Sequence, residues 1–177
     1  ENIALEVSHM GNTEPNHVKQ IRTLIADYIK TTSTIELIAQ FGLEDFEVKA
    51  LAVERTFCEK IISLVRFSYT ENPLEDLSNK VRHTYDLTLL MKRDEIMSFV
   101  NSDLFDTMLL QVAKDDDKAI PNDKNWLYNH PKDALIFSEI EMVWNTLKKV
   151  YSGSKFNELL IGKTKPPTEN EVFESLV

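Results

Sequence analysis

Two charged side chains lie among the apolar residues of predicted helices and are candidates for a chemical role. The first is Lys60, within AVERTFCEKIISLVRFSY, Ala52 to Tyr69. At about 100° of rotation per residue, Lys60 points to the same side of a helix as six apolar side chains: Val53, Phe57, Ile61, Leu64, Val65 and Phe67. Burying an ammonium group is costly unless it is paired. Either its stem lies along the core with its end in water, or the ammonium group binds an anion.

The second is Asp86, on the next predicted helix. The stretch PLEDLSNKVRHTYDLTLLMK, from Pro73 to Lys92, is apolar on one side at its start and on all sides near its end. A carboxylate in these surroundings needs a partner or a metal ion. Arg82, four residues earlier, could supply a structural salt bridge. Because two consecutive helices can pack antiparallel, Asp86 could instead meet Lys60.

Composition narrows the class of protein. The 177 residues carry a formal net charge of -9, which argues against a general affinity for nucleic-acid backbones and leaves room only for a local basic cleft. The single cysteine, Cys58, excludes an internal disulfide framework and a cysteine-based zinc site, and it favours a reducing compartment. No apolar run approaches the length of a membrane span and no leader opens the sequence. We therefore expect a cytoplasmic protein with no membrane role.

Several other kinds of site are not predicted. The four glycines form no phosphate-binding loop, and the four histidines form no zinc-like pair. The acidic run KDDDKAIPNDK, Lys114 to Lys124, lacks the ligand and glycine positions of a calcium loop, so we expect a solvated loop there. We predict no metal site among these residues.

The remaining pattern is strands followed by helices. Alternation predicts strands at Ile3 to Val7, with Glu6 on the second face, and from Phe46 onward. Helical spacing and end signals predict helices at His17 to Thr32, Ser33 to Gly42, two short ones within Asp94 to Lys114, one long one from Pro131 to Gly153, another at Ser154 to Lys163, and a last turn or two after Pro167. Asn72 and Pro73 suit the start of the Asp86 helix.

The stretch from Phe46 to Met91 resembles the AbiEii/AbiGii toxin family of bacterial nucleotidyltransferases. That family carries an E-R-T-x-x-E-K helix followed by an R-H-x-Y-D-L helix. The corresponding segments here are ERTFCEK and RHTYDL. The matching residues are Arg55, Thr56, Glu59 and Lys60 in the first motif, and Arg82, His83, Tyr85, Asp86 and Leu87 in the second.

The resemblance implies a polymerase-beta-like nucleotidyltransferase from an abortive-infection or toxin–antitoxin system. Such an enzyme uses Mg²⁺ and a nucleoside triphosphate (NTP), and it transfers a nucleotidyl group to a hydroxyl acceptor. Lys60 would contact the phosphates as a point charge, and Asp86 would orient the site. Arg55 and Arg82 would be further phosphate-binding residues. The acceptor would be transfer RNA, another nucleic acid or a protein, and a cognate antitoxin would be a partner.

One departure from the family pattern matters. The family's Gly-Ser and Asp-x-Asp metal motif is absent, because the one Gly-Ser, at Gly153, has no aspartate after it. We therefore expect the chain to be the C-terminal part of a longer enzyme and inactive alone. Glu6 is the candidate for a remaining acidic residue of the active-site sheet, and an exposed strand glutamate is the equally weighted alternative.

These considerations give a fold prediction and two functional hypotheses. The predicted class is α+β, predominantly α: residues 1–51 hold a few strands from the edge of a nucleotidyltransferase sheet, and residues 52–177 form a helical bundle. The first hypothesis is a part of a nucleotidyltransferase. The alternative is a non-catalytic helical binding or regulatory module in which Lys60 and Asp86 form an internal ion pair.

Overall fold

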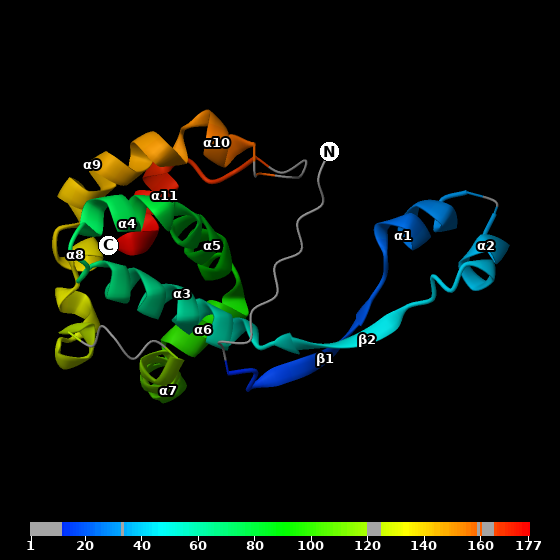
Figure 1. Cartoon of the computed structure of the whole chain (residues 1–177), viewed down its shortest axis with the longest axis horizontal. Coiled ribbons are helices and arrows are strands. Elements are labelled where there is room, and N and C mark those ends of the chain that lie inside the picture. Colours follow the sequence, from blue (N-terminus) through cyan, green and yellow to red (C-terminus); the bar gives the residue numbers. More distant parts are fainter. Residues whose placement is uncertain (1–11, 33, 120–124, 159, 161–164) are drawn as a thin grey trace. The chain divides into compact units, whose positions relative to one another are not determined.

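The computed structural model describes residues 12–32, 34–119, 125–158, 160 and 165–177. These residues divide into two compact units, one of residues 13–52 and one of residues 53–177 together with Asn12. The first unit contains a two-stranded sheet and the second is helical (Figure 1). The predicted class, α+β and predominantly α, is therefore confirmed. The assignment of residues 1–51 to the edge of a nucleotidyltransferase sheet stays a prediction.

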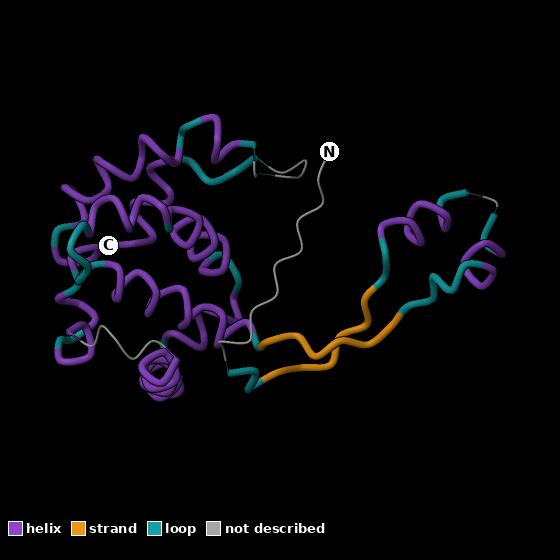
Figure 2. Tube along the Cα trace, viewed as in Figure 1, coloured by secondary structure: helices purple, strands orange, loops and turns teal. Residues whose placement is uncertain are grey.

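The unit of residues 13–52 is a two-stranded hairpin with two short helices between its strands (Figure 2). Its elements are β1 (Asn16–Ile21), α1 (Leu24–Lys30), α2 (Glu36–Gln40) and β2 (Phe46–Leu51). The strands are antiparallel, with Asn16 opposite Leu51 and Ile21 opposite Phe46. Gly42 follows α2 with a φ of 60°, a left-handed conformation that glycine adopts readily at helix ends. The predicted short helix before Gly42 and the predicted strand from Phe46 are thus confirmed.

The predicted helix from His17 to Thr32 is wrong in its first half. Its apolar residues are spaced as on one helical face, but β1 occupies the first part and only α1 is helical. Antiparallel pairing with β2 favours a strand over a helix here, because β2 supplies backbone hydrogen-bond partners along the whole length of β1. The helix begins after Thr23, whose side chain accepts a hydrogen bond from the backbone N–H of Ala26.

The helical unit contains most of the chain. Its elements are α3 (Val53–Phe67), α4 (Pro73–Asn79), α5 (Val81–Met91), α6 (Asp94–Val100), α7 (Asp103–Ala119), η1 (Asn125–Tyr128), η2 (Pro131–Asp133), α8 (Leu135–Ser138), α9 (Ile140–Tyr151), α10 (Ser154–Asn157) and α11 (Glu169–Leu176). The two short helices predicted within Asp94 to Lys114 correspond to α6 and α7, but α7 is longer than predicted and continues to Ala119. Within the described ranges, no helix has the length and apolar character needed to cross a bilayer.

Two predicted long helices are each divided. The helix predicted from Pro73 to Lys92 separates into α4 and α5 at Lys80, and the one predicted from Pro131 to Gly153 separates into η2, α8 and α9. The break at Lys80 lets the two halves pack mainly on different neighbours, α4 on α9 and α5 on α11 and α3. Lys80 itself lies over the ring of Phe67, with Nζ 4.9 Å from the ring centroid.

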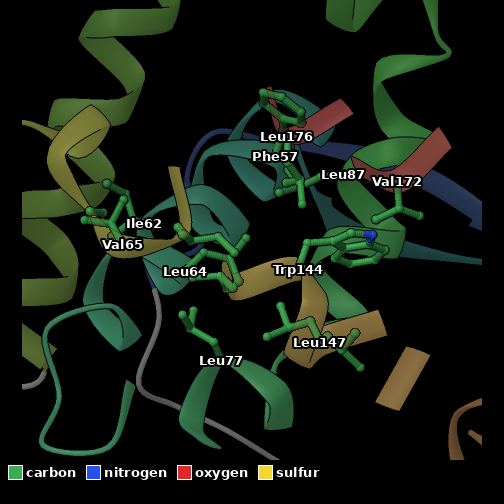
Figure 3. Packing of buried hydrophobic residues seen from close by; sticks show 14 of the residues in the cluster. Phe57, Ile62, Leu64, Val65, Leu77, Leu87, Trp144, Leu147, Val172 and Leu176 are labelled. Carbon is green, nitrogen blue, oxygen red and sulfur yellow. The ribbon is translucent and has the colours of Figure 1, made fainter. Parts of the chain in front are cut away.

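The core of the helical unit is built from side chains of several helices (Figure 3). The labelled members are Phe57, Ile62, Leu64, Val65, Leu77, Leu87, Trp144, Leu147, Val172 and Leu176. The predicted apolar face of α3 is confirmed, since Phe57, Leu64 and Val65 are buried. Packing extends further around α3 than predicted, because Cys58 and Ile62 are buried as well.

The C-terminal helix α11 is part of this core. Val172 is fully buried, and α11 packs against both α5 and α9. Thr168 and Glu171 form a capping box at its start. The hydroxyls of Thr88 and Ser175 lie 2.7 Å apart and join α11 to α5, the helix that carries Asp86. The last residues of the chain therefore support the position of α5.

Replacing Val172 with alanine should lower the free energy of unfolding by about 2 kcal/mol, because two methyl groups leave a closely packed site. Urea unfolding followed by circular dichroism measures this change. Glu174→Ala is the matched control on the exposed side of α11 and should change the free energy by less than about 0.5 kcal/mol. Equal effects of the two substitutions would show that α11 does not contribute to the core.

Candidate functional site

The structure brings Lys60 and Asp86 together. Lys60 lies on α3 and Asp86 on α5, and Lys60 Nζ donates a hydrogen bond to Asp86 Oδ2 over 2.6 Å. The two side chains keep 20% and 31% of their surface exposed, so the pair lies at the edge of the core and not inside it. Both side chains of the pair therefore remain partly in contact with solvent. The catalytic roles predicted for both residues stay predictions.

The predicted salt bridge between Arg82 and Asp86 is not the ion pair that Asp86 forms. Arg82 lies on the exposed side of α5, and Asp86 pairs with Lys60 instead. Arg82 lies about one helical turn before Asp86 on α5. Its predicted role in phosphate binding stays a prediction.

In the sequence, Arg55 and Glu59 point away from the apolar face of α3, and their spacing of four residues predicts an ion pair on a wet surface. The pair forms, but Arg55 is buried and not on the surface. Only 2% of its side chain is exposed. Its guanidinium donates from Nε to Glu59 over 2.9 Å and from Nη2 to Asp115 over 3.0 Å. The sequence of α3 alone could not reveal this burial, because the covering carboxylate comes from α7. The predicted phosphate-binding role of Arg55 stays untested, and its burial between two carboxylates does not favour it.

The acidic run that follows Lys114 is also corrected. Its first part, to Ala119, belongs to α7 and is helical, whereas we expected a loop. Asp115 accepts a hydrogen bond from Arg55, and Asp116 accepts one from Arg66 over 2.9 Å. These aspartates therefore join α7 to α3. One signal could have revealed the helix: no glycine or proline interrupts the sequence from Asp103 to Ile120.

Asp115 is the more enclosed of these carboxylates, with 13% of its side chain exposed. Burial raises its pKa, but hydrogen bonds from Asn12, Arg55 and Gln111 outweigh that effect and hold the pKa below its usual value. The carboxylate therefore stays charged at neutral pH.

His83 is a residue of this site that our interpretation of the sequence missed. It lies three residues before Asp86 on α5, a spacing that places both on the same side of the helix. Burial, as the largest cause, and the nearby positive charge of Lys60 together lower its pKa to about 4. The imidazole is therefore neutral at physiological pH. Its position within the RHTYDL segment was the available signal.

The Mg²⁺ that the resemblance implies would need a cluster of oxygen ligands, mainly carboxylates. Among the described residues, no group of three or more histidine, cysteine, aspartate or glutamate side chains could hold a metal ion. Asp115 and Asp116 bind arginines instead. Glu6 and the predicted strand from Ile3 to Val7 lie outside the described residues. The described side chains thus do not fit a metal site.

The comparisons with known proteins identify the family. The model of the family described as "Nucleotidyl transferase AbiEii toxin, Type IV TA system" matches residues 1–159, which is most of the 177-residue chain. The match includes α3, α5 and α7, and it ends before α11. Neither the curated proteins nor the solved structures compared with the chain gave a match. The chain belongs to the AbiEii family of nucleotidyltransferase toxins of type IV toxin–antitoxin systems.

Proposed function

We propose that this protein transfers a nucleotidyl group from an NTP to a hydroxyl acceptor as the toxin of a toxin–antitoxin pair. Membership of the AbiEii family supports the reaction class. The observation that supports a role for particular residues is the contact between Lys60 Nζ and Asp86 Oδ2 over 2.6 Å. An ammonium group that ends at a partly exposed edge of the core is well placed to bind an anion.

In this proposal the acceptor hydroxyl oxygen attacks the α-phosphorus of the NTP. The bond from that phosphorus to the β-phosphate oxygen breaks, pyrophosphate leaves, and the hydroxyl proton is lost to solvent or a base. Lys60 binds the phosphate groups and offsets the negative charge of the leaving pyrophosphate. Asp86 holds the Lys60 ammonium group in position through their hydrogen bond. Arg82, exposed on the same helix, adds a second positive charge at the edge.

Mg²⁺ and the acceptor belong to the proposal as well. We assign no step to the metal ion, because the described residues do not supply a site for it. The acceptor is transfer RNA, another nucleic acid or a protein. With a net charge of -9, the chain would bind a nucleic-acid acceptor through a local basic surface and not through its overall charge. A cognate antitoxin is the proposed partner, and the cytoplasm is the proposed location.

A non-catalytic binding or regulatory module is the second candidate function. Asp86 already has a partner in Lys60, as an internal ion pair requires. A transfer assay separates the two candidates.

In the assay, the protein as its gene encodes it is incubated with Mg²⁺, α-labelled NTPs and a cell extract. We expect label to enter a macromolecular acceptor, whose class is identified by nuclease or protease digestion. The 177-residue chain alone should fold but transfer no label, because it lacks the metal motif. Robust transfer by the 177 residues would contradict the expected dependence on that motif. No transfer by either protein would favour the binding module.

A further inference from the structure

His83 has a ring nitrogen that the fold leaves unused. Nδ1 of His83 is buried, and among residues 12–32, 34–119 and the later described segments it has no hydrogen-bond partner. Buried polar atoms in folded proteins nearly always have a partner, so an exception calls for an explanation. The residue as a whole is only half-buried. Nε2 is therefore the ring nitrogen that can reach a ligand.

The protonation of the ring follows from this burial. Burial and the neighbouring cations lower the pKa of His83 to about 4, so the ring carries a single proton near neutral pH. A buried donor without an acceptor is rarer in proteins than a buried acceptor without a donor. The proton therefore lies on Nε2, and the buried Nδ1 keeps its lone pair. His83 thus offers one uncharged N–H donor.

The charges around His83 favour an anion. Lys60, Lys80 and Arg82 all lower the pKa of the imidazole, whereas Asp86 raises it. Positive charge thus exceeds negative charge around the ring, although the whole chain is acidic. A neutral N–H donor among cations suits a phosphate oxygen, because it adds a hydrogen bond without adding repulsion between cations.

We propose that His83 donates a hydrogen bond from Nε2 to the phosphate group that Lys60 binds. The inference deepens the proposed function and rests on it, since it takes Lys60 as a phosphate ligand. Neither the position of His83 in the motif nor its contacts within the protein would by themselves assign it this binding role. The ligand class is a polyphosphate, as in the triphosphate of an NTP.

Isothermal titration of the 177-residue chain with inorganic tripolyphosphate tests the proposal. His83→Leu removes the donor and should weaken binding about tenfold or more. His83→Gln places its amide nitrogen near the position of Nε2 and should retain most of the affinity. His83→Asn places its amide nitrogen near the position of Nδ1 and should bind as weakly as His83→Leu. Circular dichroism of each variant verifies that it folds.

The outcomes separate this inference from the proposed function. In one outcome, the unaltered chain binds tripolyphosphate and Lys60→Met abolishes this binding, which supports the role of Lys60. If His83→Leu then binds with the same affinity as the unaltered chain, the role of His83 is overturned and that of Lys60 is not. If His83→Leu does not fold, equal affinities of His83→Gln and His83→Asn overturn it in the same way. No binding by the unaltered chain, or full binding by Lys60→Met, overturns the phosphate role of Lys60 and the His83 inference with it.

Discussion

Replacing Asp115 with alanine should lower the free energy of unfolding by about 3–5 kcal/mol, because it leaves the buried guanidinium of Arg55 without its main partner. Arg55 has 2% of its side chain exposed and cannot regain water without moving. Its Nη1 already lacks a hydrogen-bond partner among the residues that the structure describes. Glu59 would remain as its carboxylate partner, and that side chain is 36% exposed. Chemical unfolding in urea measures the loss.

Asp116→Ala is the matched control, because it breaks the other ion pair between α3 and α7. Here Arg66 is 19% exposed and Asp116 is 24% exposed, so the arginine can regain water after the change. We expect a loss of about 1 kcal/mol. If both substitutions cost the same, burial of Arg55 would not be the cause of the larger effect. A small loss at Asp115 would mean that Arg55 finds water or another partner.

The helical core could be predicted from local periodicity, and the hairpin only in part. Phe57, Leu64 and Val65 repeat at helical spacing, and their burial requires only one apolar face. The segment that forms β1 has apolar residues at positions that also suit a helix. Its conformation depends on β2, which lies some thirty residues later along the chain. Pairing over such a separation is not visible in a window of about 18 residues.

In the candidate site, as in the fold, contacts between residues close in sequence could be predicted more readily than contacts between residues far apart in sequence. Lys60 and Asp86 could be selected because each is a charge among apolar residues of a predicted helix, and the antiparallel packing expected of consecutive helices linked them. Arg55 was misplaced because Glu59, four residues later, offers a sufficient local partner. Its second partner, Asp115, lies sixty residues away and belongs to a segment interpreted as a loop. The charge pattern of α3 alone cannot predict that Arg55 is buried by a helix that lies far from it in sequence.

Lys60→Met should reduce nucleotidyl transfer by at least about 100-fold and relieve any growth arrest that the protein causes. Methionine keeps the apolar stem that packs at the edge of the core and removes the charge. The free energy of unfolding should fall by only about 1–2 kcal/mol, less than for a fully buried pair, because Asp86 is 31% exposed and can regain water. Transfer of labelled nucleotide and urea unfolding measure the two effects.

Asp86→Asn separates a phosphate role of Lys60 from the ion pair itself. It breaks the same pair but leaves the Lys60 ammonium group in place, so the loss of stability should be similar. Tripolyphosphate should still bind with comparable affinity, because the amide oxygen of the asparagine can still accept the hydrogen bond that positions Lys60, and a negative charge near the phosphate is removed. Lys60→Met should bind it far more weakly. If both variants lose affinity equally, the ion pair positions the helices and Lys60 is not a phosphate ligand. A stable and fully active Lys60→Met excludes the catalytic role, since only the charge would then be missing.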